Sequence, residues 1–219
     1  MRDHTSSQSR TISRTGGSAR RKPFTVAAAA AAGSIVVTGC STDATAGPVE
    51  GIDAARPALT TTLHDADGMR IGTATLTAMT GGAVVTVTAH SLAAGYHGLH
   101  IHTIGLCEPD SPSPTDPTII GDFLSAGGHL AHDDQTHGEH AGDLPSLYVG
   151  QDGRGTVTFA TDAFTPAELL DADGSAVMVH EGRDNYANIP DRYAPDGPDL
   201  DTLKTGDSGP RIACAALSR

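Results

Sequence analysis

The residues of this sequence best suited to metal chemistry are two histidines in the stretch Gly98-Leu99-His100-Ile101-His102. If the stretch is a β-strand, successive side chains point to opposite faces, so His100 and His102 share one face. Neutral imidazole nitrogen is a favoured ligand of copper and zinc. Two such ligands about 6 to 7 Å apart along one strand can close on a single ion. The stretch therefore predicts half of a metal site.

Further candidate ligands follow in a loop-like region and at the end of an apolar run. Within fifteen residues the chain carries His129, His132, His137, His140 and Asp143. His180 ends the apolar run 176–180. A solvated loop would explain a single histidine, but it does not explain histidines at three separate places in the sequence, namely 100–102, 129–140 and 180. We therefore expect the clusters to form one composite site.

Short strands must position these clusters. Period-two alternation, broken by Gly- and Asp-rich turns, predicts strands at 59–63, 71–79, 83–92, 96–104, 147–150, 156–160, 176–180 and 212–217. A capped helical turn is predicted at 165–170. The segment that ends at Asp143 and the segment 181–210 have no sustained apolar period, and loops this long are usually functional. We expect an all-β fold, an antiparallel sandwich or flattened barrel of about eight strands with two long functional loops.

The first 39 residues differ in composition from the rest. They hold six of the 14 Lys and Arg residues, one acid, and an apolar run from Phe24 to Val37. This run is shorter than the about 20 residues that span a membrane, and it ends at the small-residue site Val37-Thr38-Gly39-Cys40. Residues 1–39 are therefore predicted to be an export signal.

The cleavage site resembles a bacterial lipobox. The resemblance implies that Cys40 is lipidated and anchors the protein to the outer face of the cell membrane. Residues 40–56, rich in Ala, Gly, Thr and Asp, are predicted to be a flexible tether, and 57–219 to be the folded domain. Arg20-Arg21 also resembles a twin-arginine signal, so the general secretory and twin-arginine routes both stay open.

Charge limits the possible partners. Without residues 1–39 the chain has 8 basic and 25 acidic side chains, a formal charge of −17 with histidine neutral. Such a surface repels nucleic acid and anionic lipid, so we expect no nucleic-acid partner. An anionic substrate would need local positive charge.

Two cysteines remain besides Cys40, namely Cys107 and Cys214. In an exported protein an isolated pair indicates a disulfide. It would close a loop of about 100 residues, worth about 4 kcal/mol in the chain-entropy model.

Five motifs resemble, in order, the copper,zinc superoxide dismutases. They are Gly98-Leu99-His100-Ile101-His102, Gly127-Gly128-His129, His140-Ala141-Gly142-Asp143-Leu144-Pro145, Val179-His180-Glu181 and Gly209-Pro210-Arg211-Ile212-Ala213-Cys214. The resemblance runs from about Leu59 to Leu217 and is most similar to the exported, actinobacterial lipoprotein-like branch. It implies a Greek-key β-sandwich or barrel, in agreement with the strand pattern.

The resemblance also implies the ligands. His100, His102, His129 and His180 match copper ligands, with His129 bridging to zinc. His129, His137, His140 and Asp143 match the zinc ligands. Asp184 matches an aspartate that hydrogen-bonds ligands of both metals, and His97 matches a packing histidine beneath the site.

The loop that carries the zinc ligands departs from the usual family pattern. Only two residues separate His137 from His140, where other members carry a longer insert. That length resembles mycobacterial members that bind copper without zinc, yet those members lack a histidine at the position of His140. We favour a zinc site, and a copper-only site or His132 in place of His137 remain alternatives.

The implied activity is dismutation of superoxide to dioxygen and hydrogen peroxide, which protects the cell envelope from extracellular superoxide. Arg211 would dock the anion beside copper, and His129 would deliver a proton. The alternative is a non-catalytic copper- or zinc-binding lipoprotein on the same fold. Arg211 and Asp184 favour the enzyme, because a storage protein needs neither. The sequence predicts no oligomeric state.

Overall fold

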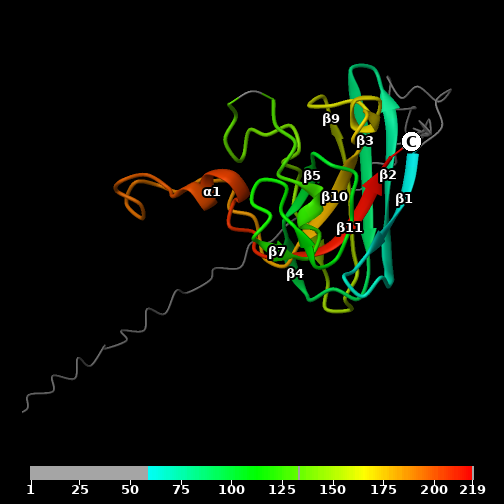
Figure 1. The fold of residues 1–219 in the computed structure, drawn as a ribbon, viewed down its shortest axis with the longest axis horizontal. Coiled ribbons are helices and arrows are strands. Elements are labelled where there is room, and N and C mark those ends of the chain that lie inside the picture. Colours follow the sequence, from blue (N-terminus) through cyan, green and yellow to red (C-terminus); the bar gives the residue numbers. More distant parts are fainter. Residues whose placement is uncertain (1–58, 133, 219) are drawn as a thin grey trace, which may run out of the picture. The chain divides into compact units, whose positions relative to one another are not determined.

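A computed structural model describes residues 59–132 and 134–218, which fold mainly into β-strands (Figure 1). The strands are β1 Leu59–His64, β2 Arg70–Met79, β3 Gly82–Ala89, β4 Gly95–His97, β5 Leu99–His102, β6 Ser111–Pro112, β7 Ile120–Gly121, β8 Leu147–Val149, β9 Gly155–Thr161, β10 Ser175–His180 and β11 Arg211–Leu217. Two 3₁₀ turns, Leu124–Ala126 and Glu168–Leu170, and the helix α1, Leu200–Thr205, complete the elements. The prediction of an all-β fold is confirmed.

The predicted export signal, Cys40 and the tether lie outside the described residues. Among the residues that are described, none belongs to a helix long and apolar enough to cross a membrane.

Nine strands form one antiparallel sheet in the order β4-β8-β9-β3-β2-β1-β11-β10-β5. Strands β4 and β5 stand at the two ends of this order, yet only Gly98 separates them in the chain. The sheet must therefore curl until its edges approach, so it is nearly closed into a barrel. The Gly98 amide donates to Gly182 at 2.8 Å, and the His180 amide donates to the Gly98 carbonyl at 2.9 Å.

The single strand predicted at 96–104 is therefore wrong. It is broken at Gly98 into β4 and β5, which pair with different partners. A Cβ atom at position 98 would lie 2.6 Å from the Cβ atom of Ser208, so only glycine fits at this junction. The strand predicted at 83–92 ends earlier, at Ala89.

Alternation along the strands separates the core from the metal-binding face. Leu99 and Ile101 of β5 are fully buried and belong to the main hydrophobic cluster, together with Val85 and Val87 of β3. Each such side chain contributes about 1.5–3 kcal/mol through its burial. His100 and His102 alternate with Leu99 and Ile101, so they lie on the opposite face of β5, as predicted. They are buried as well, at 0% and 1% exposure, because the long loops cover them.

The predicted disulfide is confirmed. Cys107, in the loop after β5, is bonded to Cys214 of β11, and their Cα atoms lie 5.6 Å apart. Cys214 is fully buried and pairs with His64 on one side and Met178 on the other. The bond therefore ties the first long loop to an interior strand of the sheet.

The capped turn at 165–170 is also present. The Thr165 amide donates to the Glu168 carboxylate, and the Glu168 amide donates back to the Thr165 hydroxyl at 3.4 Å. The helix α1 in the second long loop was not predicted. Its N-cap residue Asp199 accepts from the Thr202 amide at 2.9 Å, and Gly206 ends it in a left-handed conformation. These caps were visible in the sequence, but one and a half turns leave too short an apolar period to detect.

Candidate metal centre

The loop 129–143 runs along the free edge of β5, the last strand in the sheet order. Antiparallel bridges pair His102 with His129 and His100 with Asp143. Each histidine of the strand is therefore held opposite a candidate ligand from the loop. The local alternation of β5 and this pairing together bring distant sequence positions into one site.

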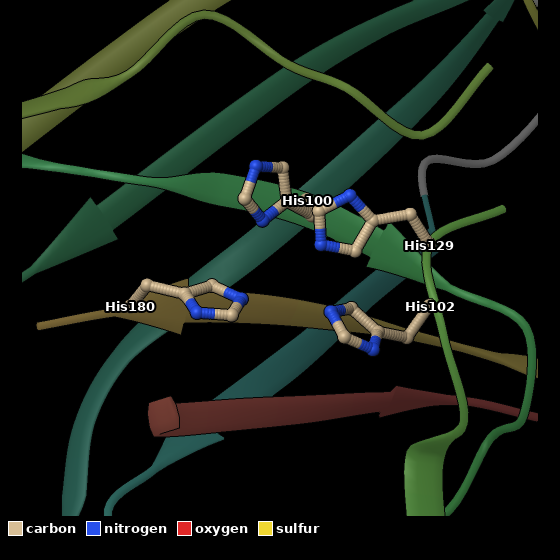
Figure 2. A group of neighbouring side chains, drawn as sticks. All are labelled: His100, His102, His129 and His180. Atoms are coloured by element: carbon tan, nitrogen blue, oxygen red, sulfur yellow. The ribbon is translucent and has the colours of Figure 1, made fainter. Parts of the chain in front are cut away.

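Four histidines form the first cluster. His100 and His102 come from β5, His180 from the end of β10, and His129 from the loop (Figure 2). Each offers a ring nitrogen, and these four nitrogens lie within 4.8 Å of one another. The rings of His100 and His129 are stacked with their centroids 3.9 Å apart. These are the four residues that the resemblance matched to copper ligands.

Backbone carbonyls fix the orientation of two of these rings. His102 Nδ1 lies 2.9 Å from the Gly127 carbonyl, and His180 Nδ1 lies 2.8 Å from the Gly209 carbonyl. Because a carbonyl only accepts, each Nδ1 carries the hydrogen and each Nε2 keeps its lone pair. The Nε2 atoms of His102 and His180, and the Nδ1 of His100, are buried with no hydrogen-bond partner among the described residues. Such an atom costs about 1–3 kcal/mol unless a ligand satisfies it.

A second cluster adjoins the first and shares two of its rings. It consists of His100, His129, His137 and Asp143, whose ligand atoms also lie within 4.8 Å of one another. Asp143 Oδ1 lies 2.9 Å from His129 Nδ1 and 3.1 Å from His137 Nδ1. His129 therefore faces both clusters, as a bridging ligand would.

Asp184 connects the two clusters by binding one histidine of each. Its Oδ2 accepts from His100 Nε2 at 2.8 Å, and its Oδ1 accepts from His137 Nε2 at 2.7 Å. The Tyr186 amide donates to the same Oδ1 at 2.7 Å. Such outer carboxylates fix the tautomer and the direction of ligating imidazoles. Here the carboxylate binds the Nε2 atoms of His100 and His137, so their Nδ1 atoms face the clusters.

The two remaining loop histidines lie outside both clusters. His140 stands at the edge, with Nδ1 3.3 Å from Asp143 Oδ2. His132 is exposed, and its Nε2 lies 3.4 Å from the Ala163 carbonyl. The structure thus brings His137, rather than His132, to the second cluster.

His97 is buried beneath the site, at 2% exposure. Its Nδ1 lies 2.8 Å from the His180 carbonyl and its Nε2 lies 2.9 Å from the Ala93 carbonyl. Both nitrogens are therefore engaged by the backbone, and the ring packs between β4 and the end of β10. This is the position expected of a packing residue.

Burial keeps the first cluster neutral. It lowers the pKa of His129 to about 4 and that of His180 to about 3. The pKa of His102 is lowered well below its usual range by burial and then by the charge of Arg211. Burial also lowers the pKa of His100, against the opposing effect of Asp184. Neutral imidazole is the form that binds a metal, so the four rings are ready to bind at neutral pH.

The second cluster concentrates negative charge. Burial alone would lower the pKa of His137, but hydrogen bonds and charges from Asp143 and Asp184 raise it to about 9. The same contacts overcome the effect of burial on both carboxyls and hold their pKa values well below the usual range. The two carboxylates therefore favour a positive charge at the second cluster.

A cleft of about 790 Å³ opens onto the first cluster. Its lining includes His129, His180, Lys204 and Arg211. Arg211 Nη1 donates to the Phe123 carbonyl at 2.6 Å, and Nη2 donates to the Gly127 carbonyl at 2.7 Å. Burial lowers the pKa of Arg211 to about 10, which leaves it charged at neutral pH. The guanidinium is therefore a fixed positive charge in the wall of the cleft.

Sequence reasoning missed the backbone groups that orient these side chains. The Gly127 carbonyl accepts from both His102 and Arg211, so one peptide group aligns a cluster histidine and the cleft cation. Phe123 adopts a left-handed conformation, with φ 59°, that turns the chain there. A positive φ at a buried phenylalanine has no sequence signal. The glycine pair at 127 and 128 was the available hint.

Comparison with known proteins agrees with this geometry. The sequence model of the family described as copper/zinc superoxide dismutase (SODC) matches residues 70–217. The chain is 45% identical over 190 residues to a superoxide dismutase [Cu-Zn] of Mycolicibacterium paratuberculosis, covering 83% of each protein. It is 44% identical over 167 residues to the corresponding protein of Mycobacterium tuberculosis, covering 73% of this chain and 69% of that protein.

A solved structure agrees at the level of the fold. The Cu/Zn superoxide dismutase from Brucella abortus superposes with a TM-score of 0.58 at 28% identity. The match covers 74% of this chain and 99% of that one.

Proposed function

This chain belongs to the copper/zinc superoxide dismutase family, and on that premise we propose how its residues divide the work of a two-metal site. The protein is a superoxide dismutase, which converts two superoxide ions and two protons into dioxygen and hydrogen peroxide. The copper ligands are His100, His102, His129 and His180. The zinc ligands are His129, His137, Asp143 and His140.

The observation that carries the proposal is the set of unpartnered nitrogens. His100 Nδ1, His102 Nε2 and His180 Nε2 are buried with no hydrogen-bond partner in the described parts of the chain. Leaving three such atoms unsatisfied would cost several kcal/mol, at about 1–3 kcal/mol each. All three belong to the first cluster. An all-nitrogen set suits copper, and a mixed nitrogen and oxygen set suits zinc.

A bound copper ion supplies the one-electron chemistry, because imidazole ligands suit both of its oxidation states. Arg211 binds and orients the substrate. Its guanidinium lines the same cleft as His129 and His180, and two carbonyls hold it in place. A small anion attracted to that charge is held beside the first cluster. The acidic surface repels an anionic substrate, but Arg211 provides a local positive charge. A recessed positive charge focuses the electric field within the cleft.

His129 moves the proton. Its Nδ1 is directed to Asp143, so Nε2 is the nitrogen that faces the first cluster. In the proposed cycle Nε2 holds a proton after the first superoxide has been oxidised and gives it to the peroxide formed from the second. The lowered pKa of His129 makes it a ready proton donor once protonated.

The position of His140 is the part of the zinc set that most needs testing. It contacts the Asp143 carboxylate but lies outside the group of four. A shift of its ring toward the cluster would complete a set of three histidines and one carboxylate. The shift is a local one, because His140 and Asp143 are already in contact.

The experiment is a count of copper and zinc per chain in the domain 57–219 and in three variants. Wild type should bind one of each metal. His102→Ala should lose copper and keep zinc, whereas His137→Ala and His140→Ala should lose zinc and keep copper. If His140→Ala keeps its zinc, the zinc set must exclude His140. If wild type binds copper alone, the zinc assignment fails and the copper assignment stands.

The three cysteines bear on where the protein is located in the cell. The Cys107–Cys214 disulfide belongs to an oxidising compartment outside the cytosol. Residues 1–39 direct export, and Cys40 becomes a lipid-modified N-terminus joined to the domain by the tether 40–56. Basic flank, apolar run and cleavage site occur in the order that this requires. A metal-storing lipoprotein would use the same clusters, but it gives Arg211 no role in the cleft, so it is not favoured.

A further inference from the structure

Tyr186 joins three parts of the metal centre that are distant in sequence. It follows Asp184 by two residues, and its amide donates to Asp184 Oδ1 at 2.7 Å. Its ring stacks on His137 with an interplanar angle of 20° and a centroid separation of 6.3 Å. Its hydroxyl reaches the segment just after Asp143. Tyr186 therefore contacts the Asp184 bridge through its amide and the second cluster through its ring.

The hydroxyl is anchored to the wall of the barrel. It donates to the Leu144 carbonyl at 3.2 Å and accepts from the Ser146 amide at 2.9 Å. The Ser146 hydroxyl lies 2.9 Å from it as well. Leu144 is 2% exposed and belongs to the main core cluster, and β8 begins at Leu147. The phenol therefore connects the loop that carries Asp184 to one of the rigid parts of the fold.

The backbone at this point is strained. Tyr186 and Ala187 have φ values of 54° and 51°, in the left-handed region that non-glycine residues avoid. Such conformations persist where surrounding contacts over-determine them, and they concentrate at functional sites. The Tyr186 carbonyl also lies against Gly138, where an added Cβ would stand 2.6 Å from it. The loop of His137 and the loop of Asp184 are therefore packed directly on each other at Tyr186.

We propose that Tyr186 is a positioning residue for the second metal: its phenol fixes Asp184 and the ring of His137 against the barrel wall at residues 144–146. This inference rests on the proposed zinc site. Asp184 accepts three hydrogen bonds, and the one from Tyr186 is the only one of the three that does not come from a proposed metal ligand. Tyr186 thus supplies a restraint on Asp184 that comes from outside the proposed ligand set.

The first test is Tyr186→Phe, which removes the hydroxyl and keeps the ring on His137. We expect the dissociation constant of zinc to rise about tenfold, the factor that corresponds to one net hydrogen bond. Copper affinity should change by less than about twofold, because His100 and His102 lie on β5. Cobalt(II) in the zinc position gives the second readout, since a looser set of ligands changes its visible absorption spectrum. Tyr148→Phe, at an exposed tyrosine of β8, is the matched control and should leave both values unchanged.

Ser146→Ala is the milder second variant, and it keeps the proposal testable if Tyr186→Phe does not fold. It removes one partner of the phenol and should weaken zinc binding about two- to threefold. When Ser146→Ala is combined with Tyr186→Phe, it should cause little further loss of zinc affinity. The phenol hydroxyl that Ser146 contacts is already absent in that double variant.

Two outcomes overturn the inference, and they are distinguishable. If wild type binds two metals and both Tyr186→Phe and Ser146→Ala retain zinc as tightly, Tyr186 has no positioning role. If wild type binds copper alone, the zinc site fails together with the role assigned to Tyr186. Tenfold weaker zinc binding with an altered cobalt spectrum supports the inference.

Discussion

At the scale of single residues, three rings of the first cluster, those of His100, His102 and His180, use one nitrogen for structure and leave the other for a ligand. Carbonyls of Gly127 and Gly209 and the carboxylate of Asp184 make this choice. The candidate ligands were predictable from motifs, because their residue types are fixed by metal chemistry. The tautomers of these histidines could not be predicted. Every residue has a backbone carbonyl, so the sequence does not show which carbonyl will accept from a histidine. His140 shows the same limit, as spacing alone did not predict that its ring stands at the edge.

Arg211 offers the most direct test at this scale. Arg211→Ala should lower kcat/KM for superoxide on the order of tenfold or more, because the cleft loses a fixed cation. Arg211→Lys should lie between the two, since it keeps the charge but cannot make the paired contacts to Phe123 and Gly127. Activity is measured per bound copper. Wild-type activity per copper in Arg211→Ala would exclude the docking role.

The neutral histidines predict a pH dependence of stability. The folded-state pKa values of His129 and His180, about 4 and about 3, lie below their ordinary value of 6.5. Between pH 6.5 and about 4 the unfolded chain therefore binds more protons, and acid favours unfolding. His137 has a raised pKa and is charged in both states below pH 6.5, so it adds no slope there.

The free energy of unfolding of the metal-free domain should therefore fall with acidification, on the order of 1 kcal/mol per pH unit for each histidine held neutral. Urea unfolding between pH 7 and pH 4 measures it. His180→Gln should reduce the slope, and His90→Gln, at a half-buried residue outside the site, should not. A slope unchanged by His180→Gln would show that its neutrality is not linked to folding.

At the scale of elements, the strands could be predicted because β2 and β3 alternate strongly and β10 is a continuous apolar run. The break at Gly98 could not, because it depends on Ser208, a residue distant in sequence that fills the space of a side chain. The hairpin of β6 and β7 and the helix α1 are too short for their periods to appear. The long loops could be predicted as loops because they have no sustained apolar period, but their packing against β5 is a tertiary property.

The role of the disulfide in holding the first long loop can be tested by removing it. Cys214→Ser should leave the strands intact, as judged by circular dichroism, and should weaken copper retention. The physical reason is that the loop after β5 loses its tie to β11, the strand that begins at Arg211. Opening a loop of this length should also lower stability by about 4 kcal/mol. Unchanged copper affinity and activity in Cys214→Ser would refute this role.

At the scale of the whole molecule, the acidic surface and the Arg211 guanidinium in the wall of the cleft act in opposition. The excess of acidic side chains repels superoxide at long range, while the recessed Arg211 attracts it at short range. The described residues account for the site, and the proposed anchor lies in the part of the chain that precedes them. The disulfide and the sequence of residues 1–40 are the features that support export.

The anchor is tested with the full-length chain in a bacterial host. Cys40→Ser should move the protein from the membrane fraction to the soluble fraction, because no thiol remains to be acylated. Ser41→Ala, at the next position, is the control and should stay with the membrane. Mass spectrometry of the mature N-terminus identifies the lipid. A wild-type protein found entirely in the soluble fraction would contradict the anchor.

The most direct test of the central claim joins metal content to turnover in one sample. Copper per chain and superoxide-dependent turnover are measured on the wild-type domain as copper is titrated in. The account predicts that turnover rises in proportion to copper and reaches its limit at one copper per chain. A domain that holds one copper at the four-histidine cluster and does not turn over superoxide would contradict it.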